Sequence, residues 1–216
     1  MLSLWYHLKP TGRSIMAKSD KTRTRILDAA ADVFADKGYH DTRMDEIVDA
    51  SHTSKGAVYH HFPSKNYIFF ALIDKFTKLL EARLKAAIEK EPHGLQRVDA
   101  AIQICMQTFG QYRTLAKIAL VQAVGLGEAF EEKRREINDR FAGIIQEYLD
   151  QAIDDGSIPE IDTEVAARAW MGALNEVVLR WVYTGSPDPD RAAPALRTLL
   201  LRSIGVSEKR IAELEE

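Results

Sequence analysis

One short run, residues 54–65, constrains what this chain can fold into more than any other segment. It reads Ser-Lys-Gly-Ala-Val-Tyr-His-His-Phe-Pro-Ser-Lys, so Pro63 ends a short helical segment and Ser64 can cap a new one. The segment has too little apolar surface for a core helix, yet it is dense in side chains that can bond phosphate. Because it follows two other helical segments, it is typical of a helix-turn-helix, and DNA binding is the leading hypothesis.

Two helical segments precede this run. The apolar residues of segment 20–37 recur at helical spacing, and Gly38 would end that helix. Thr42 can cap a second short helix, with Asp45 reaching back as in a capping box. The turn follows, and Thr53 or Ser54 can cap the third helix. The expected inward residues are Ile26, Ala29, Ala30, Val33 and Phe34 in the first helix, Met44, Ile47, Val48 and Ala50 in the second, and Ala57, Val58 and Phe62 in the third.

The polar residues of the third helix are then left on its outer side. Gly56 would let the helix backbone approach a groove or a phosphate closely. Lys55, Tyr59 and the two His residues supply hydrogen-bond donors to phosphate oxygens. Lys65 lies at the start of the next helix, where free N–H groups also favour an anion.

These residues resemble a known family. Agreement in order and spacing extends over roughly the first third of the chain, which makes the match specific. The family is the TetR family of bacterial transcriptional regulators, and the resemblance implies an all-helical homodimer with one DNA-binding head per subunit and a helical body that binds a small effector. The matching residues are Thr24-Arg25-Ile26-Leu27-Asp28-Ala29-Ala30, Phe34, Gly38-Tyr39, Thr42, Ile47 and the run 54–65.

The resemblance also implies which residues contact DNA. The start of the third helix would face bases, while its last turn and the start of the next helix would hold phosphates. The expected contacts are Lys55, Gly56 and Ala57 to bases, Tyr59, His61 and Lys65 to phosphates, and Thr42 to the backbone, with Arg43, Thr53, Ser54 and His60 completing the surface.

The turn departs from the family at two positions. His52 stands where the family usually has Gly, and Thr53 where it usually has Val. His can adopt a left-handed conformation at some cost, so the fold is expected to survive. The operator sequence cannot be transferred by analogy.

Single residues of the run have simpler explanations. Tyr59 could be core packing, Lys55 a solvated charge, and His60-His61 a metal site. Adjacent helical residues point about 100° apart, and no Cys or third His lies at ligand spacing, so no metal is expected. Taken together, and placed before Pro-Ser-Lys, these residues favour DNA.

Composition and charge exclude several other classes. The 216-residue chain has a net charge of −3, but residues 1–65 hold 10 Lys and Arg against 8 Asp and Glu and are mildly basic. The single Cys excludes an intrachain disulfide and fits a reducing cytoplasm. No apolar run approaches the roughly 20 residues that a membrane span requires. No pattern indicates an enzyme or a cofactor, because neither an acid–base pair beside a nucleophile nor a phosphate-binding Gly loop is found.

The predicted fold class is all-α, in three parts. Residues 1–19 are expected to be a disordered extension, in which Met16 is a candidate natural start. Residues 20–65 form the helix-turn-helix DNA-binding domain, and residues 66–216 a helical effector-binding and dimerisation domain. Beyond residue 65 the pattern predicts helices over 66–90, 95–112, 114–124, 128–154, 162–183 and 190–204.

The last two long helices are expected to form a homodimer interface. Their apolar stripes are wider than one core face requires, and small residues would let another helix come close. Two such helices per subunit would make a four-helix interface by two-fold symmetry, as the resemblance also implies. Packing within the chain alone is the alternative. The expected interface residues are Ala169, Ala173, Val177, Trp181, Leu196, Leu199 and Leu200.

The resemblance places an effector pocket among the middle helices. Aromatic and Met residues at helical spacing are more often plain core, so polar residues within apolar stripes are the better indicators. Gln103, Gln122, Asn175 and Arg180 are such residues, and Arg180 could meet an acyl or carboxylate group. Cys105 is more consistent with a buried small hydrophobe than with a redox sensor. The candidate lining is Met106, Phe109, Tyr112, Phe141, Trp170, Met171, Asn175 and Arg180, with Leu120 and Ile145 as further candidates.

The sequence therefore predicts a cytoplasmic, sequence-specific DNA-binding regulator. It would be a repressor that a small, mostly apolar effector releases from a duplex operator. The alternative is a helical small-molecule-binding or scaffold protein without specific DNA binding. That alternative explains the body but not the run from Tyr59 to Lys65.

Overall fold

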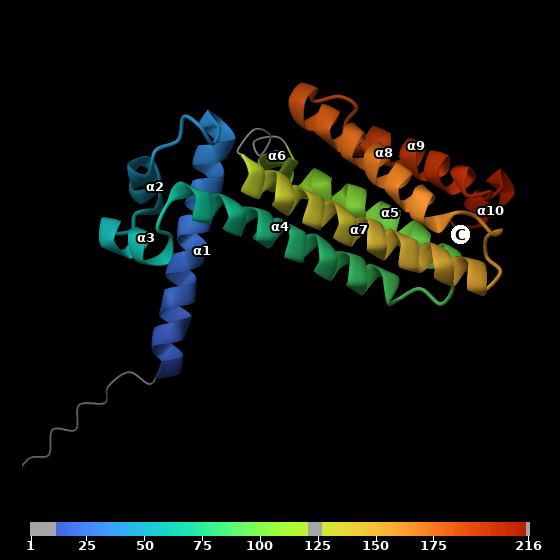
Figure 1. The fold of residues 1–216 in the computed structure, drawn as a ribbon, viewed down its shortest axis with the longest axis horizontal. Helices are drawn as coiled ribbons and strands as arrows, with labels where there is room; N and C mark the ends of the chain where they lie inside the picture. The colour runs from blue at the N-terminus through green and yellow to red at the C-terminus, as the bar shows by residue number, and fades with distance from the viewer. Residues whose placement is uncertain (1–11, 121–126, 215–216) are drawn as a thin grey trace, which may run out of the picture. The chain divides into compact units, whose positions relative to one another are not determined.

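The computed structural model describes residues 12–120 and 127–214, and every regular element in these ranges is a helix (Figure 1). The predicted all-α class is confirmed. The chain divides into two compact units after Leu72, called the head and the body below. The head contains α1 (Gly12–Lys37), α2 (Met44–Ser51), α3 (Lys55–His61) and the first turns of α4 (Lys65–Ile88). The body contains the rest of α4, α5 (Gly94–Gln111), α6 (Arg113–Leu120), α7 (Glu128–Asp154), α8 (Thr163–Thr184), α9 (Pro189–Ser203) and α10 (Glu208–Glu213).

The head closes around the apolar stripe predicted for its first helix. Ile26 and Phe34 of α1 are fully buried, and so are Ile47 of α2 and Val58 of α3. The ring of Phe34 meets the edge of Phe69 on α4 at 5.7 Å between centroids. Burial of such side chains from four short segments is what makes helices of seven or eight residues stable, since isolated helices of that length are not.

Two expectations about the head need correction. Helix α1 begins at Gly12 and not at residue 20, because no proline interrupts the intervening residues; residues 1–11 of the expected extension lie outside the described residues. In α2, Ala50 is exposed, and Ser51 is buried in its place. Burial costs Ser51 little, because its hydroxyl donates to the Val48 carbonyl at 3.0 Å.

In the body, α5 packs against α7 and α9, and α8 packs against α7 and α9. The first turn of α5 lies very close to the last turns of α7: a Cβ at Gly94 would stand 2.5 Å from the backbone of Ala152. The Gly94 N–H donates to the Asp155 carboxylate at 2.7 Å. Glycine is therefore required at this position because a Cβ would clash with the Ala152 backbone, and not because of its φ.

Most predicted helices of the body are confirmed within about two residues, and the bounds of α7 coincide with the prediction. Of the segment 114–124, residues up to Leu120 lie in α6, while 121–126 lie outside the described residues. Helix α10 was not predicted, because six residues are too few to show a helical period. It is recognisable only by its cap, Ser207, whose hydroxyl accepts from the Arg210 N–H, and by its buried Ile211.

Candidate nucleic-acid interface and ligand cavity

The third helix has the predicted local geometry. The Ser54 hydroxyl accepts a hydrogen bond from the Ala57 N–H at 3.3 Å, which confirms Ser54 as the cap. Val58 and Phe62 are buried, so they anchor the helix by its inner side. Lys55, Gly56, Tyr59 and His60 are exposed. This side of α3 is free to meet a ligand, with a basic residue at its first position.

His52 ends α2 in the left-handed conformation that the departure from the family predicted. Its φ and ψ are 48° and 39°. Thr53, the next residue, accepts a hydrogen bond from Arg25 of α1 at 2.9 Å. The turn is therefore tied to α1 by a side chain and is held in a conformation that a glycine would adopt more easily.

Thr42 does not have the role expected of it. Its side chain is 2% exposed, and its hydroxyl donates to the carbonyl of Gly38 at 2.7 Å. Arg43 is the cap of α2: its N–H donates to the Glu46 carboxylate at 2.8 Å, and the Glu46 N–H donates to the Arg43 carbonyl at 3.1 Å. The predicted Thr42–Asp45 capping box is wrong by one residue, because the carbonyl left free where α1 ends is the nearer partner for Thr42.

Lys65 also differs from the expectation. Its ammonium group donates to the carbonyls of Tyr39, His40 and Thr42 at 2.8, 2.9 and 3.0 Å. It lies 4.5 Å from the centre of the Tyr39 ring. An ammonium has three donors, so all three are engaged. Lys65 thus holds the turn between α1 and α2, because that turn offers three converging carbonyls.

Two further side chains of the predicted surface have charged neighbours. The Lys55 ammonium lies 3.0 Å from the Asp45 carboxylate of α2, and the hydrogen bond and charge of Asp45 raise the pKa of Lys55. His61 is half-buried; burial, followed by the charges of His60 and Arg23, lowers its pKa. The lowered pKa favours the neutral form of His61, which still has one N–H donor.

The body contains a cavity of about 100 Å³ that is partly open to solvent. Phe76, Leu80 and Leu84 of α4 form one wall. The remaining walls come from α5, α7 and α8, with Leu120 of α6. Among the described residues that line the cavity, none is charged. Its wall is almost wholly aliphatic and aromatic, so it fits an apolar ligand.

The cavity gathers five of the eight expected effector-binding residues: Phe109, Phe141, Trp170, Met171 and Asn175. The further candidates Leu120 and Ile145 also line it. The other three candidates, Met106, Tyr112 and Arg180, are not among the residues that line it.

Met106 is 2% exposed and borders a separate small space beside Trp181. The Arg83 guanidinium lies over the Tyr112 ring, 5.8 Å from the ring centre. Arg180 is exposed. Of the other polar indicators, Gln103 is exposed and Gln122 lies outside the described residues.

Sequence reasoning missed Asn138 and Tyr148 of α7, which also line the cavity. A signal existed for Asn138, which is a polar residue directly after Ile137 and near Phe141 on an otherwise apolar side. Cys105 lines the cavity as well, and burial raises the pKa of its thiol to about 12. It therefore remains a protonated, unreactive thiol, which agrees with the expectation of a small hydrophobe.

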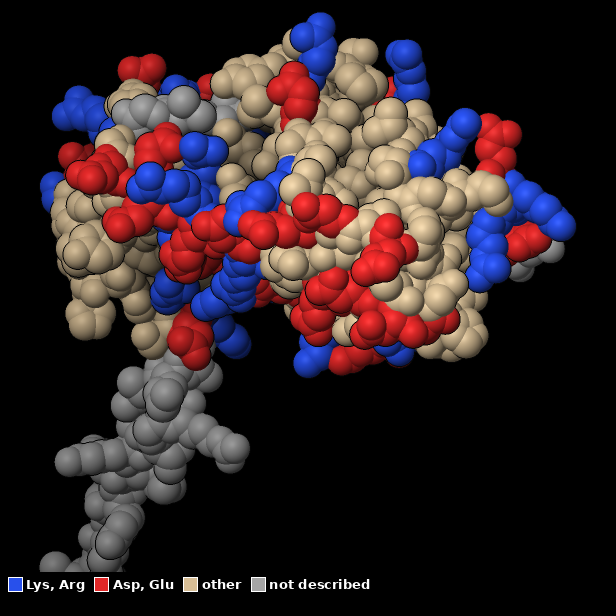
Figure 2. Space-filling view, turned by 45° about the vertical axis from the view of Figure 1, so that its right-hand side comes forward, with Lys and Arg blue, Asp and Glu red and all other residues tan. Residues whose placement is uncertain are grey.

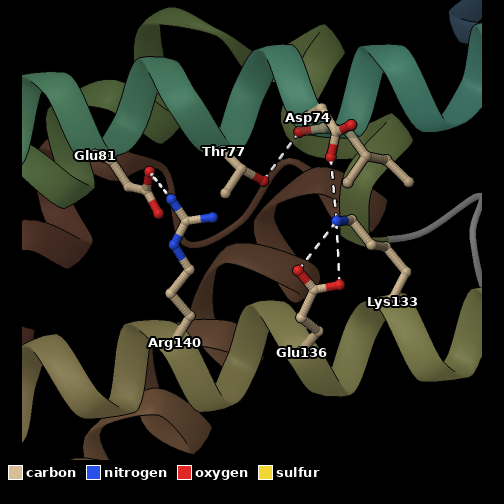
Figure 3. Close-up of polar contacts among 7 residues, drawn as sticks. Asp74, Thr77, Glu81, Lys133, Glu136 and Arg140 are labelled. Atoms are coloured by element: carbon tan, nitrogen blue, oxygen red, sulfur yellow. Dashed lines mark hydrogen bonds and ion pairs between the residues drawn. The ribbon is translucent and has the colours of Figure 1, made fainter.

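Beside the cavity, α4 and α7 are joined by ion pairs between long side chains. Figure 3 shows Lys133 of α7 between Asp74 of α4 and Glu136, at 3.3 and 3.2 Å, and Arg140 of α7 paired with Glu81 of α4. One Glu81 oxygen, Oε1, is buried and has no hydrogen-bond partner among the described residues. The α4 wall is thus held to α7 by polar side chains at its edge.

The predicted dimer residues divide into two groups. Trp181 of α8 and Leu196 and Leu200 of α9 are buried within the body, because α9 packs against α5 and α8. Their assignment to an interface is therefore wrong. Ala169 and Leu199 are exposed, and Ala173 and Val177 are half-buried.

An exposed apolar row nevertheless remains on these two helices. On α8 it includes Val165 at 61% exposure and Tyr183 at 64%, with Ala169 between them at helical spacing. Leu199 of α9 is 59% exposed. In the view of Figure 2, Asp and Glu side chains gather with Lys and Arg in mixed groups, while uncharged residues fill other parts of the face.

Head and body together define a helix-turn-helix transcriptional regulator with an internal cavity. Residues 26–72 match the family described as bacterial regulatory proteins, tetR family, and residues 91–204 match the tetracyclin repressor-like C-terminal domain. The chain belongs to the TetR family. Among the described residues, no helix is long and apolar enough to cross a membrane.

Several known proteins are similar over nearly the whole chain. The HTH-type transcriptional regulator SrpR of Pseudomonas putida is 24% identical over 192 residues, covering 87% of this chain and 86% of that protein. The structure of the fatty acid degradation regulator FadR of Bacillus halodurans has a TM-score of 0.77 at 20% identity, covering 86% of this chain and 97% of that one. FadR of Bacillus subtilis, solved in complex with stearoyl-CoA, has a TM-score of 0.75 at 23% identity and covers 84% and 98%.

Proposed function

We propose that this regulator binds a near-palindromic operator as a homodimer, and that a small, mostly apolar effector in the body cavity releases it. The observation that carries the DNA-binding half is the exposed side of α3, which presents Lys55, Gly56 and Tyr59 from a helix anchored by Val58 and Phe62. A protein of this kind acts where the chromosome is, in the cytoplasm. Two recognition helices would enter successive major grooves roughly 34–36 Å apart, or a multiple of that.

The expected DNA contacts follow from the hydrogen-bonding groups that each side chain offers. Lys55, Gly56 and Ala57 would meet base edges, while Tyr59, His60 and His61 would donate to phosphates. Arg43, exposed at the start of α2, would contact the DNA backbone with Thr53 and Ser54. Residues 20–65 would be the DNA-binding domain, completed by the first turns of α4, and the rest the effector and dimerisation domain.

The homodimer would use the exposed row on α8 and α9. Val165, Ala169 and Tyr183 of one subunit would pack with Leu199 and the same residues of a second copy. A two-fold arrangement of these helices gives a four-helix interface in which each patch faces its own copy. Ala169 and Gly172 leave room for close approach of the partner helix.

The effector would be a molecule with a substantial apolar part. The uncharged lining supports this, and the similarity to a FadR solved with stearoyl-CoA adds an acyl chain as the first compound to try. Release would work through α4, because Phe76, Leu80 and Leu84 line the cavity and the same helix begins at Lys65 in the head.

The ligand would favour a state whose heads no longer fit the operator. A tenfold loss of DNA affinity requires about 1.4 kcal/mol of coupling between the two sites. The regulator would then be a repressor released by its ligand.

The test is a selection of genomic DNA fragments on the purified protein, followed by titration of the enriched site. The proposal expects one enriched near-palindrome whose binding weakens steeply with salt. If no site is enriched, and retention on duplex DNA disappears at moderate salt, the alternative of a helical ligand-binding protein without specific DNA contact would replace it.

A further inference from the structure

Among the residues 12–120 and 127–214, those that line the cavity carry few polar groups, and none of these groups is charged. Of its described lining residues, only Asn138, Asn175, Tyr148 and Cys105 carry a polar side-chain atom with no assigned partner, and the Cys105 thiol stays protonated. Trp170 also lines the cavity, but its indole N–H already donates to the Ser203 hydroxyl at 3.0 Å. Among the described lining residues, the hydrogen-bonding partners that a ligand meets are therefore two amides and a phenol.

The two amides lie on neighbouring helices, Asn138 on α7 and Asn175 on α8. Both are half-buried, and neither side chain has a hydrogen-bond partner among the described residues. An amide offers two donors and an acceptor, and leaving them unpaired in an apolar site costs free energy. Polar residues without partners inside an otherwise apolar cavity are the groups that would fix the position of a ligand.

No described residue that lines the cavity is a cation, and two cations beside the cavity are held in ion pairs. Arg180 is exposed and does not line the cavity. Lys133 and Arg140 of α7 are paired with Asp74 and Glu81 of α4 (Figure 3). A carboxylate brought into the cavity would have no free positive partner there, and an unpaired charge in an apolar site is far more costly than a neutral polar group.

We propose that the cavity selects a ligand whose enclosed part is an apolar chain bearing one neutral hydrogen-bond acceptor, an ester-, thioester- or amide-type carbonyl, which Asn138 and Asn175 bind. A free carboxylic acid is excluded in its ionised form. Any charged part of the natural ligand lies outside, through the open side of the cavity. This inference rests on the proposed effector site and defines the chemical class that the site takes.

The test compares three probes of matched chain length: methyl decanoate, decanoate and decane. Binding to the full-length protein at pH 7.5 would be followed by titration calorimetry and by the change in total tryptophan emission, to which Trp170 contributes from the cavity wall. The variants are Asn138→Leu, Asn175→Leu and the double variant; Leu has the same branching and the same number of side-chain heavy atoms as the Asn it replaces. Gln107→Leu is the matched control, because Gln107 is an exposed residue of α5 outside the cavity.

The wild type should bind methyl decanoate at least tenfold more tightly than decanoate. The double variant should lose roughly tenfold for the ester, the scale of one or two hydrogen bonds, with no loss for decane. Gln107→Leu should change neither. Equal or tighter binding of decanoate, or unchanged ester binding in the double variant, would overturn the inference. In the second case the cavity would still bind apolar ligands, and the proposed function would stand. If no probe bound the wild type at all, the effector proposal itself would fail.

Discussion

The head and the body use polar side chains in opposite ways. In the head, several of them bond to the main chain. Lys65 donates to three carbonyls and Thr42 to one, while Glu46 and Ser54 accept from N–H groups at helix starts. In the body, the amides of Asn138 and Asn175 line the cavity and have no hydrogen-bond partner among the described residues. The head therefore has a preset surface, whereas the body has a site that a ligand must complete.

The largest effect on stability is expected from a charge placed in the body core, in contrast to a charge placed on the expected dimer surface. Trp181→Glu places a charge among core residues, so it should cost about 4 kcal/mol of stability and unfold the body. Leu199→Glu lies on the exposed row and should yield a folded monomer with nearly unchanged melting temperature. Sedimentation and thermal unfolding distinguish the two. A Leu199→Glu protein that remains a dimer at micromolar concentration would place the interface elsewhere.

The next effect concerns Lys65 and separates a structural clamp from a phosphate contact. Lys65→Met should weaken operator binding at least tenfold while leaving the salt dependence unchanged, because no phosphate contact is lost. Loss of one phosphate contact would reduce the slope of log affinity against log salt by about 0.9.

Lys65→Arg is the control for this prediction. A guanidinium keeps the charge, but its planar fork does not suit three converging carbonyls, so the clamp predicts no rescue. Recovery of wild-type affinity in Lys65→Arg, with a normal slope, would restore the phosphate role.

A smaller effect tests whether α3 reads bases. Lys55→Ala should cost about 1–3 kcal/mol at the preferred base pair and broaden the set of bound sites. Tyr59→Phe removes only a hydroxyl and should weaken all sequences alike, by about 1 kcal/mol. Binding of a randomised operator library to each variant would show the difference. Equal loss of specificity in both variants would contradict the assignment of Lys55 to bases and Tyr59 to phosphates.

How much the sequence predicted differs between the two regions for a physical reason. The head is built from segments close in the chain, so the cap at Ser54, the left-handed His52 and the outward side of α3 were all predictable. The departures from the expected contacts in the head are also local. Thr42 and Lys65 donate to backbone carbonyls, whose positions no side-chain pattern reveals.

In the body, the helices were predictable from their period, but which side of each helix meets which neighbour was not. Arg180 therefore entered the candidate site and Asn138 did not. The buried ion pair between Asp99 of α5 and Arg197 of α9 was missed for the same reason, because 98 residues separate its partners.

The smallest effect is expected at the turn of the head. His52→Gly removes the cost of a side chain at φ 48° and should raise stability by about 1 kcal/mol. Thermal unfolding measures it, with Ala50→Gly in α2, which should be destabilising, as the opposite case. A destabilised His52→Gly protein would mean that the His52 side chain makes a contact worth more than the strain.

The measurement that tests the account most directly is operator affinity with and without a ligand that occupies the cavity. It would be made on the wild-type protein with methyl decanoate, with occupancy of the cavity determined by titration calorimetry. The account predicts that saturating ligand weakens operator binding at least tenfold, and that the Asn138→Leu/Asn175→Leu protein needs roughly tenfold more ligand for the same effect. Full occupancy of the cavity with unchanged operator affinity would contradict it.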